Sequence, residues 1–226
     1  LTFVETIESL ARKFGIEIVY DGGNAPIVQK DTTKDELLKL YDRVAGSFHY
    51  LLTQSVHGSA ALKYLHDRFV SDEIIAKFRL GYSPADRKWL YSFLRKKGYS
   101  EDFLSQSGLF SKKNQEAAFF SNRLMFPICN RKGQVVAFGG RILSGDGPKY
   151  LNSSDLPQYK KGETLFAFDL ALPEIRTTKS VIFCEGYMDV LAWHQAGISR
   201  AVAPLGTAFT DEQASLVRTF ADTVYV

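Results

Sequence analysis

The sequence predicts an α/β (α+β) fold, in which a mixed N-terminal subdomain of helices and a β-hairpin precedes the first βαβαβ unit of a parallel sheet. Three observations predict it. Helical apolar spacing dominates residues 33–107, two apolar runs flank a polar turn within 124–138, and apolar runs alternate with helical spacing over 180–226. We therefore expect two parts, 1–178 and 179–226, with the second ending in its third strand.

Helical periodicity organises the first part of the chain. Apolar residues on one face predict a short helix from Phe3 to Phe14, and glycines and a proline predict a linker over 21–32. Thr33 and Glu36 have the spacing of a capping box, which opens a helix. The inward face of that helix is expected to hold Leu37, Tyr41, Val44, Phe48, Leu51 and Leu52. Shorter helices are expected near 59–68, 72–78, 86–97 and 101–107, with a turn at 81–84.

A β-hairpin is expected in the middle of the chain. Residues 124–129 and 134–138 are strand-like, and the polar turn at 130–133 joins them. Gly, Ser, Asn, Asp and Pro dominate 139–162, which we expect to form long loops. Loops of that length inside a compact domain are usually functional or mobile.

The last third alternates between strand and helix patterns. The continuous apolar run at 180–184 is typical of a buried parallel strand. Helical spacing follows over 187–195, then a second strand at 200–203. A second capping box at 210–213 opens another helix, and 223–226 begins a third strand. Because βαβ crossovers are right-handed, these strands should be parallel neighbours in one sheet.

Charge is distributed unevenly along a chain whose net charge is +3. Residues 121–161 hold seven Lys or Arg and two acids, whereas residues 162–226 hold four basic and eight acidic residues. A basic stretch followed by an acidic one suits a site where metal ions meet polyphosphate or nucleic acid. The alternative is a solvated basic loop region, and charge alone does not decide between them.

The cysteines, the apolar runs and the chain ends limit which class of protein this chain can belong to. Cys129 and Cys184 lie in apolar runs, as buried reduced thiols of a cytosolic protein do, and no Cys/His cluster has zinc spacing. No apolar run reaches the ~20 residues that cross a bilayer, so no membrane partner is expected. The chain starts without Met and stops within a strand pattern, so both ends are expected to be fragment boundaries.

Two acids follow the first strand of the predicted parallel sheet. Glu185 comes directly after that strand, Gly186 permits a sharp turn, and Asp189 falls in the first turn of the next helix. Two such carboxylates could hold a divalent metal through oxygen ligands. They could equally be a helix-start acid and an exposed Glu. The glycine turn at 204–207 lies at the same edge and could leave room for a metal or a phosphate, or be an ordinary βα turn.

These residues resemble a known family. EGYMDV at 185–190 and VAPLGTA at 202–208 resemble the TOPRIM region of bacterial (DnaG-type) primases. Upstream blocks are similar to that family in the same order: NRLMFPI at 122–128, VAFGGR at 136–141, PKYLNS at 148–153 and KGETLF at 161–166. FRLGYSP at 78–84 also resembles it, so the likeness covers nearly the whole chain.

The resemblance implies a DNA primase, which synthesises short RNA primers on single-stranded DNA by metal-dependent nucleotidyl transfer with Mg²⁺ or Mn²⁺. It makes Glu185 the catalytic residue and a metal ligand, with Asp189 supporting the metal. Lys149, Asn152 and Lys161 would meet the ribonucleoside triphosphate. Arg123 and Arg141 would line the groove that follows the template DNA. The supporting residues implied are Tyr150, Gly186, Gly206 and Thr207.

The resemblance also implies what surrounds this chain. Through the full-length protein, the partners would be a replicative helicase and single-strand-binding protein, at a bacterial replication fork in the cytoplasm. The family's Asp-x-Asp pair would follow Val226, and its zinc lies in an N-terminal domain that precedes these residues. The piece alone is therefore expected to be inactive. Two alternatives are another TOPRIM enzyme, such as a topoisomerase or repair nuclease, and a non-catalytic single-strand-binding module.

Overall fold

The computed structural model describes residues 32–206 and 209–226, together with Ile7 and Ala11. The chain divides into two compact units, Leu1–Thr32 and Thr33–Val226, and almost all described residues belong to the second. Ile7 and Ala11 are helical; the rest of the predicted helix from Phe3 to Phe14, most of the linker at 21–32 and Thr207 lie outside the described residues. Within the described ranges, no helix is long and apolar enough to cross a bilayer.

The long amphipathic helix is α2 (Thr32–Gln54), and all six residues predicted for its inward face are buried. The capping box predicted at Thr33 and Glu36 is wrong. The helix already includes Thr32, so Thr33 is helical, whereas an N-cap residue lies outside the helical conformation. The short helix η1 (Val56–Gly58) follows.

Four shorter helices match the predicted pattern: α3 (Ser59–Asp67), α4 (Asp72–Lys77), α5 (Trp89–Lys96) and α6 (Glu101–Gln106). Ser71 and Ser100 cap the N-termini of α4 and α6, because each hydroxyl accepts a backbone N–H three residues on. The predicted turn at 81–84 is wrong, because Gly81–Ser83 forms strand β1, which pairs antiparallel with β4.

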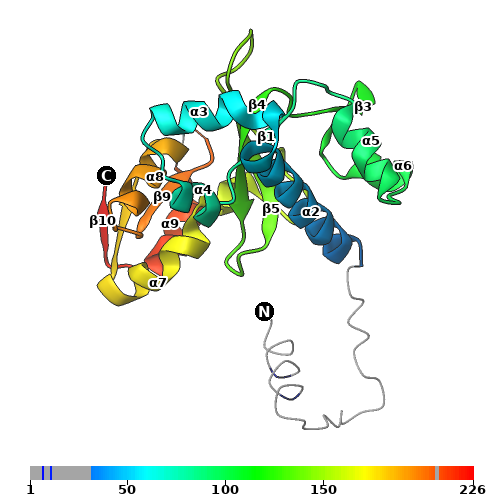
Figure 1. Ribbon diagram of the computed structural model, residues 1–226. Coiled ribbons are helices and arrows are strands. Elements are labelled where there is room, and N and C mark those ends of the chain that lie inside the picture. The colour runs from blue at the N-terminus through cyan, green and yellow to red at the C-terminus, as the bar shows by residue number, and fades with distance from the viewer. Residues whose placement is uncertain (1–6, 8–10, 12–31, 207–208) are drawn as a thin grey trace, which may run out of the picture. The chain divides into compact units, whose positions relative to one another are not determined.

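The predicted hairpin is confirmed and forms the centre of a four-stranded sheet (Figure 1). Its strands are β4 (Arg123–Cys129) and β5 (Val135–Ile142), and Gly133 closes the turn at φ 74° by donating its N–H to the Asn130 carbonyl. The sheet order is β1-β4-β5-β6.

The expectation of long loops over 139–162 is wrong in part. Strand β5 continues to Ile142, and β6 (Tyr150–Asn152) pairs with it, so that Gly139 faces Asn152 and Arg141 faces Tyr150. A separate hairpin of β2 (Phe110–Ser111) and β3 (Asn114–Ala118) was not predicted, because its strands are short and lack clear alternation.

The predicted parallel unit is confirmed. Strand β8 (Ser180–Phe183) pairs parallel with both β9 (Ala201–Pro204) and β10 (Thr223–Tyr225). The crossover helices are α8 (Tyr187–Gln195) and α9 (Asp211–Arg218). The capping box at the start of α9 is also confirmed, since the Thr210 hydroxyl accepts from the Gln213 N–H and the Gln213 side chain accepts from the Thr210 N–H.

An edge strand and a helix precede this parallel unit. Strand β7 (Leu165–Phe166) follows η2 (Lys161–Glu163) and pairs antiparallel with β9, giving the sheet order β10-β8-β9-β7. Helix α7 (Phe168–Thr178) then packs on the sheet. Strand β7 thus lies before the domain boundary predicted between residues 178 and 179, a boundary that stays a prediction.

Three aromatic rings join the two sheets. Phe126 of β4, Phe166 of β7 and Tyr187 of α8 are all buried, with ring centroids 4.5–6.2 Å apart. Gly139 of β5 faces the same ring cluster, and a Cβ there would lie 2.5 Å from Tyr187 Cε2. A side chain at position 139 is therefore excluded by the packing of α8 against the central sheet.

Replacing Gly139 with Ala is expected to lower the free energy of unfolding by about 1–3 kcal/mol, because the added methyl group displaces a rigid buried ring. Gly46→Ala is the matched control. It lies within α2, where a Cβ would meet only Arg79 Nη2 at 3.9 Å, so stability should hold or rise. Denaturant unfolding measures both variants. Equal stability of Gly139→Ala and the parent chain would contradict this packing.

Arg123 is a structural residue of the central sheet in this fold. It is 5% exposed, and its Nη1 donates to the carbonyls of Gly140 at 3.1 Å and Pro148 at 3.0 Å. Burial lowers its pKa from the ordinary range of arginine. The guanidinium therefore fixes the loop before β6 to the hairpin.

Arg123→Ala is expected to lower the free energy of unfolding by about 1–3 kcal/mol, since two carbonyls lose their donor. Arg131→Ala, on the exposed hairpin turn, serves as the control and should stay within about 0.5 kcal/mol of the parent. Thermal melts and single-stranded DNA titrations distinguish the two roles of Arg123. Weakened DNA binding with an unchanged melting temperature would assign it to the groove instead.

Candidate active site

A pocket of about 510 Å³ lies where the two sheets meet. It is bounded by β6, η2, the turn after β8, the start of α8 and the end of β9. Six predicted site residues line it together: Tyr150, Asn152, Lys161, Glu185, Gly186 and Gly206. The carboxyl ends of β8 and β9 thus meet the lysine- and asparagine-bearing segments at one place, as expected for open α/β sheets.

Asn152 connects the two sides of this pocket. Its Nδ2 donates to the carbonyl of Leu205 at 2.5 Å, and its Oδ1 accepts the hydroxyl of Tyr187 at 2.6 Å. Burial raises the pKa of Tyr187, so the phenol stays protonated and remains a donor. One donor and one acceptor site of the Asn152 amide are therefore used within the protein, and one Nδ2 hydrogen is left for a ligand.

Lys161 brings a positive charge to the pocket. Its side chain is exposed, and its backbone N–H donates to Asp155 Oδ1 at 2.9 Å, which fixes the start of η2. A Cβ at Gly206 would lie 3.2 Å from both Cε and Nζ of Lys161. The ammonium group therefore lies over the glycine at the end of β9, and the absence of a side chain there leaves it room.

Glu185 and Asp189 are exposed; Glu185 lies in the turn after β8 and Asp189 in the first turn of α8. A Cβ at Gly186 would lie 3.5 Å from Asp189 Oδ2, and both acids line a second hollow of about 560 Å³. Glu185 belongs to both hollows, whereas Asp189 does not line the first. Two carboxylates give oxygen ligands that suit Mg²⁺, which usually takes one or two from protein. The described residues hold no group of three His, Cys, Asp or Glu side chains that could bind a metal.

Cys184 lies beside these acids without being reactive. Burial raises its pKa to about 11, and the negative charge of Asp189 acts in the same direction. Both cysteines are free; Cys184 is buried and Cys129 is half-buried, where burial raises its pKa to about 12. Neither is a thiolate nucleophile near neutral pH.

The remaining predicted residues lie outside the first pocket. Arg141 is half-buried; its Nη1 donates to the Tyr150 hydroxyl at 2.8 Å, and its guanidinium lies over the Tyr150 and Tyr64 rings at 5.4 and 5.1 Å. Lys149 is exposed directly before β6. Arg123 is buried in the sheet, away from the pocket lining. Tyr150, which does line the first pocket, packs its ring against Tyr187 and accepts the hydrogen bond from Arg141.

Two site residues were missed from the sequence. Tyr187 is part of the EGYMDV block and could have been found there. Tyr64 lies on α3 and has no local signal, because its role depends on a contact with a strand far along the chain.

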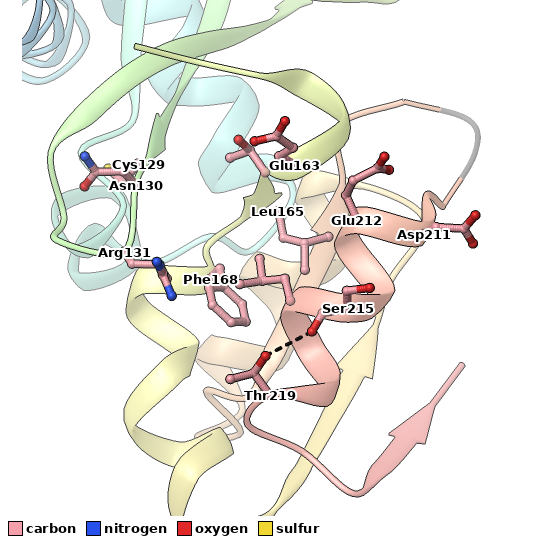
Figure 2. Close-up of a pocket in the computed structure, with 12 residues that line it drawn as sticks. Cys129, Asn130, Arg131, Glu163, Leu165, Phe168, Asp211, Glu212, Ser215 and Thr219 are labelled. Atoms are coloured by element: carbon pink, nitrogen blue, oxygen red, sulfur yellow. Dashed lines mark hydrogen bonds between the residues drawn. The ribbon is translucent and has the colours of Figure 1, made fainter. Parts of the chain in front are cut away.

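A larger hollow of about 690 Å³ contains none of the predicted site residues. Figure 2 shows it between the hairpin turn at Arg131, strand β7 at Leu165 and helix α9, with the acids Asp211 and Glu212 on the first turn of that helix. Its lining includes neither Lys161 nor Asn152, and neither of the glycines Gly186 and Gly206 that border the first pocket. The first pocket, by contrast, brings six predicted site residues together.

Comparison with known proteins identifies the family of the chain. A family model described as "DNA primase catalytic core, N-terminal domain" matches residues 48–172, and one described as "Toprim-like" matches 182–226. The DNA primase of Treponema pallidum (strain Nichols) is 49% identical over 227 residues, covering 100% of this chain and 37% of the relative. That of Borreliella burgdorferi is 44% identical over 202 residues, covering 86% and 38%. The chain thus spans a little over a third of the length of these curated relatives.

Solved structures give the same result. The RNA polymerase domain of Mycobacterium tuberculosis primase DnaG, with a double-stranded DNA oligomer bearing a 6-nucleotide overhang, has a TM-score of 0.78 and 31% identity, over 84% of this chain and 63% of the other. A DnaG primase catalytic domain bound to single-stranded DNA has a TM-score of 0.77 and 32% identity, over 85% and 61%. Motifs, fold and comparisons together show that this chain belongs to the DNA primase family, as part of its catalytic core.

Proposed function

We propose that this chain is the part of a DNA primase that binds the incoming ribonucleotide and carries one acidic side of the catalytic centre. The observation that carries the proposal is the convergence of Lys161, Asn152 and Glu185 in one pocket at the carboxyl ends of β8 and β9. The DNA-bound relatives described above support single-stranded DNA as the template. The reaction is nucleotidyl transfer, in which a 3′-hydroxyl attacks an α-phosphate and pyrophosphate leaves.

Lys161 and the turn at Gly206 provide the phosphate side of the site. The exposed ammonium gives a point charge for the triphosphate, and the bare glycine backbone lets phosphate oxygens approach. Asn152 offers its free Nδ2 hydrogen in a direction set by Leu205 and Tyr187. Lys149 is close in sequence and exposed, and we assign it to the outer phosphates.

Glu185 and Asp189 provide the acidic side. They would hold a divalent cation, Mg²⁺ or Mn²⁺, which supplies charge neutralisation for the attacking and leaving oxygens when bound. Glu185, which borders the nucleotide pocket, is also placed to accept the proton of the attacking hydroxyl. The described residues bring two carboxylates to this site and no group of three potential metal ligands, so we propose that this piece alone does not synthesise primers.

Arg141 and Tyr150 extend the pocket toward the template. The Arg141 guanidinium is held by a hydroxyl and two rings, so it keeps its charge in a fixed place beside β6. Contacts to phosphate of this kind give affinity without reading sequence. Through the full-length protein, we propose a replicative helicase and single-strand-binding protein as partners at a cytoplasmic replication fork.

In the full-length enzyme, Glu185→Gln is expected to reduce primer synthesis by about two powers of ten or more, because the amide keeps the shape and loses the charge and the proton acceptor. DNA affinity should hold or rise, since a negative charge near phosphates is removed. Primer synthesis, the thermal melt and a single-stranded DNA titration are measured together.

Glu163→Gln is the matched control, because Glu163 is an exposed acid of the hollow in Figure 2 and has no place in the proposed site. It should retain normal activity. A folded, DNA-binding Glu185→Gln enzyme with more than about a tenth of normal activity would contradict the role of Glu185.

A further inference from the structure

Phe69 follows α3 in a conformation that favours glycine. Its φ is 60°, and the backbone forms a Schellman motif, in which the Phe69 N–H donates to the His66 carbonyl and the Val70 N–H to the Leu65 carbonyl. The residue at this position is usually Gly, because a Cβ makes the left-handed conformation unfavourable. A large aromatic side chain here therefore opposes the stability of the helix end.

The fold holds this backbone in place without using the side chain. Gln195 of α8 donates its Nε2 to the Phe69 carbonyl at 2.7 Å and accepts the Ser71 N–H on its Oε1 at 2.8 Å. The Phe69 residue itself is 85% exposed. Helix α4, which follows, lies beside α8 (Figure 1). A strained position that presents an unpacked aromatic ring on a fixed backbone is better explained by a ligand than by folding.

The surroundings of Phe69 indicate which ligand. A hollow of about 470 Å³ is lined by Phe69, Arg68, the apolar side chains of Val70 and Met188, and Asp189. Asp189 also lines the hollow that contains Glu185, so the two hollows are neighbours. The hollow at Phe69 therefore combines an exposed ring and apolar side chains, which suit a base, with the guanidinium of Arg68, which suits the adjoining phosphate.

Cations and aromatic rings alternate from Phe69 toward the active site. The Arg68 guanidinium lies over the Tyr64 ring at 5.3 Å, and Arg141 lies over the same ring at 5.1 Å. Arg141 in turn holds Tyr150, which lines the nucleotide pocket. Two acids close to Phe69 in the chain are paired: Asp67 with Lys63 at 2.7 Å and Asp72 with His66 at 2.9 Å. Proteins bind single-stranded nucleic acids with positive side chains that contact the backbone and aromatic rings on which the bases stack.

We propose that Phe69 is a stacking platform for an unpaired base of the single-stranded template, with Arg68 on the adjoining phosphate. The inference rests on the proposed function and extends it by placing the template strand on the α3–α4 connection. It also assigns Tyr64 as a positioning residue, because its one ring carries both Arg68 and Arg141.

The test uses the full-length enzyme and a fluorescently labelled oligo-dT, with affinity measured over a range of salt concentrations. Phe69→Gly should raise the melting temperature, because it relieves the left-handed strain, and weaken binding roughly tenfold, because stacking is lost. Phe69→Leu should weaken binding similarly, and Phe69→Trp should retain it and show tryptophan quenching on DNA addition. The salt dependence should be unchanged in all three, whereas Arg141→Ala should reduce it.

Val56→Ala is the matched control, since Val56 is also 85% exposed and should not affect DNA affinity. Parent-like affinity of both Phe69→Gly and Phe69→Leu, with Arg141→Ala impaired, would overturn the stacking role and leave the proposed function intact. Failure of the parent enzyme to bind oligo-dT would overturn both. If Phe69→Gly loses activity only when a protein partner is added, with DNA affinity unchanged, Phe69 contacts protein and the proposal is wrong.

Discussion

Asn152 holds together the two sheets between which the proposed chemistry takes place. It lies on β6 of the central sheet, yet the nitrogen and the oxygen of its side-chain amide bond to the parallel unit, at the Leu205 carbonyl directly after β9 and the Tyr187 hydroxyl of α8. These two hydrogen bonds fix β6 against the end of β9 and the start of α8. The pocket that Lys161 and Glu185 both line lies at this junction.

The rest of the site follows from what this junction allows. Tyr187 can reach Asn152 because Gly139 gives its ring space, and Lys161 can lie at the end of β9 because Gly206 has no side chain. Tyr150, two residues before Asn152, extends the wall outward by binding Arg141. Tyr150 of β6 and Arg141 of β5 thus connect the proposed nucleotide pocket to Tyr64 on α3, where the proposed template surface lies.

Much of this could be predicted from the sequence, for identifiable reasons. The parallel unit, the hairpin and the capping box at Thr210 depend on periodicity and short-range hydrogen bonds, which the sequence displays directly. Six site residues were placed together because their motifs resemble one family. The rest depends on long-range pairing. Strands β6 and β7 are too short to show alternation, and the burial of Arg123 depends on carbonyls 17 and 25 residues away.

The central claim is that metal and nucleotide meet at Glu185, and anomalous diffraction tests it most directly. Crystals of the full-length protein's catalytic core, grown with Mn²⁺ and a non-hydrolysable ribonucleoside triphosphate, would be measured at the manganese absorption edge. The account predicts an anomalous peak within coordination distance of a Glu185 carboxylate oxygen, with the triphosphate beside Lys161. A peak at Asp211 and Glu212, in the hollow of Figure 2, with none at Glu185 would contradict it.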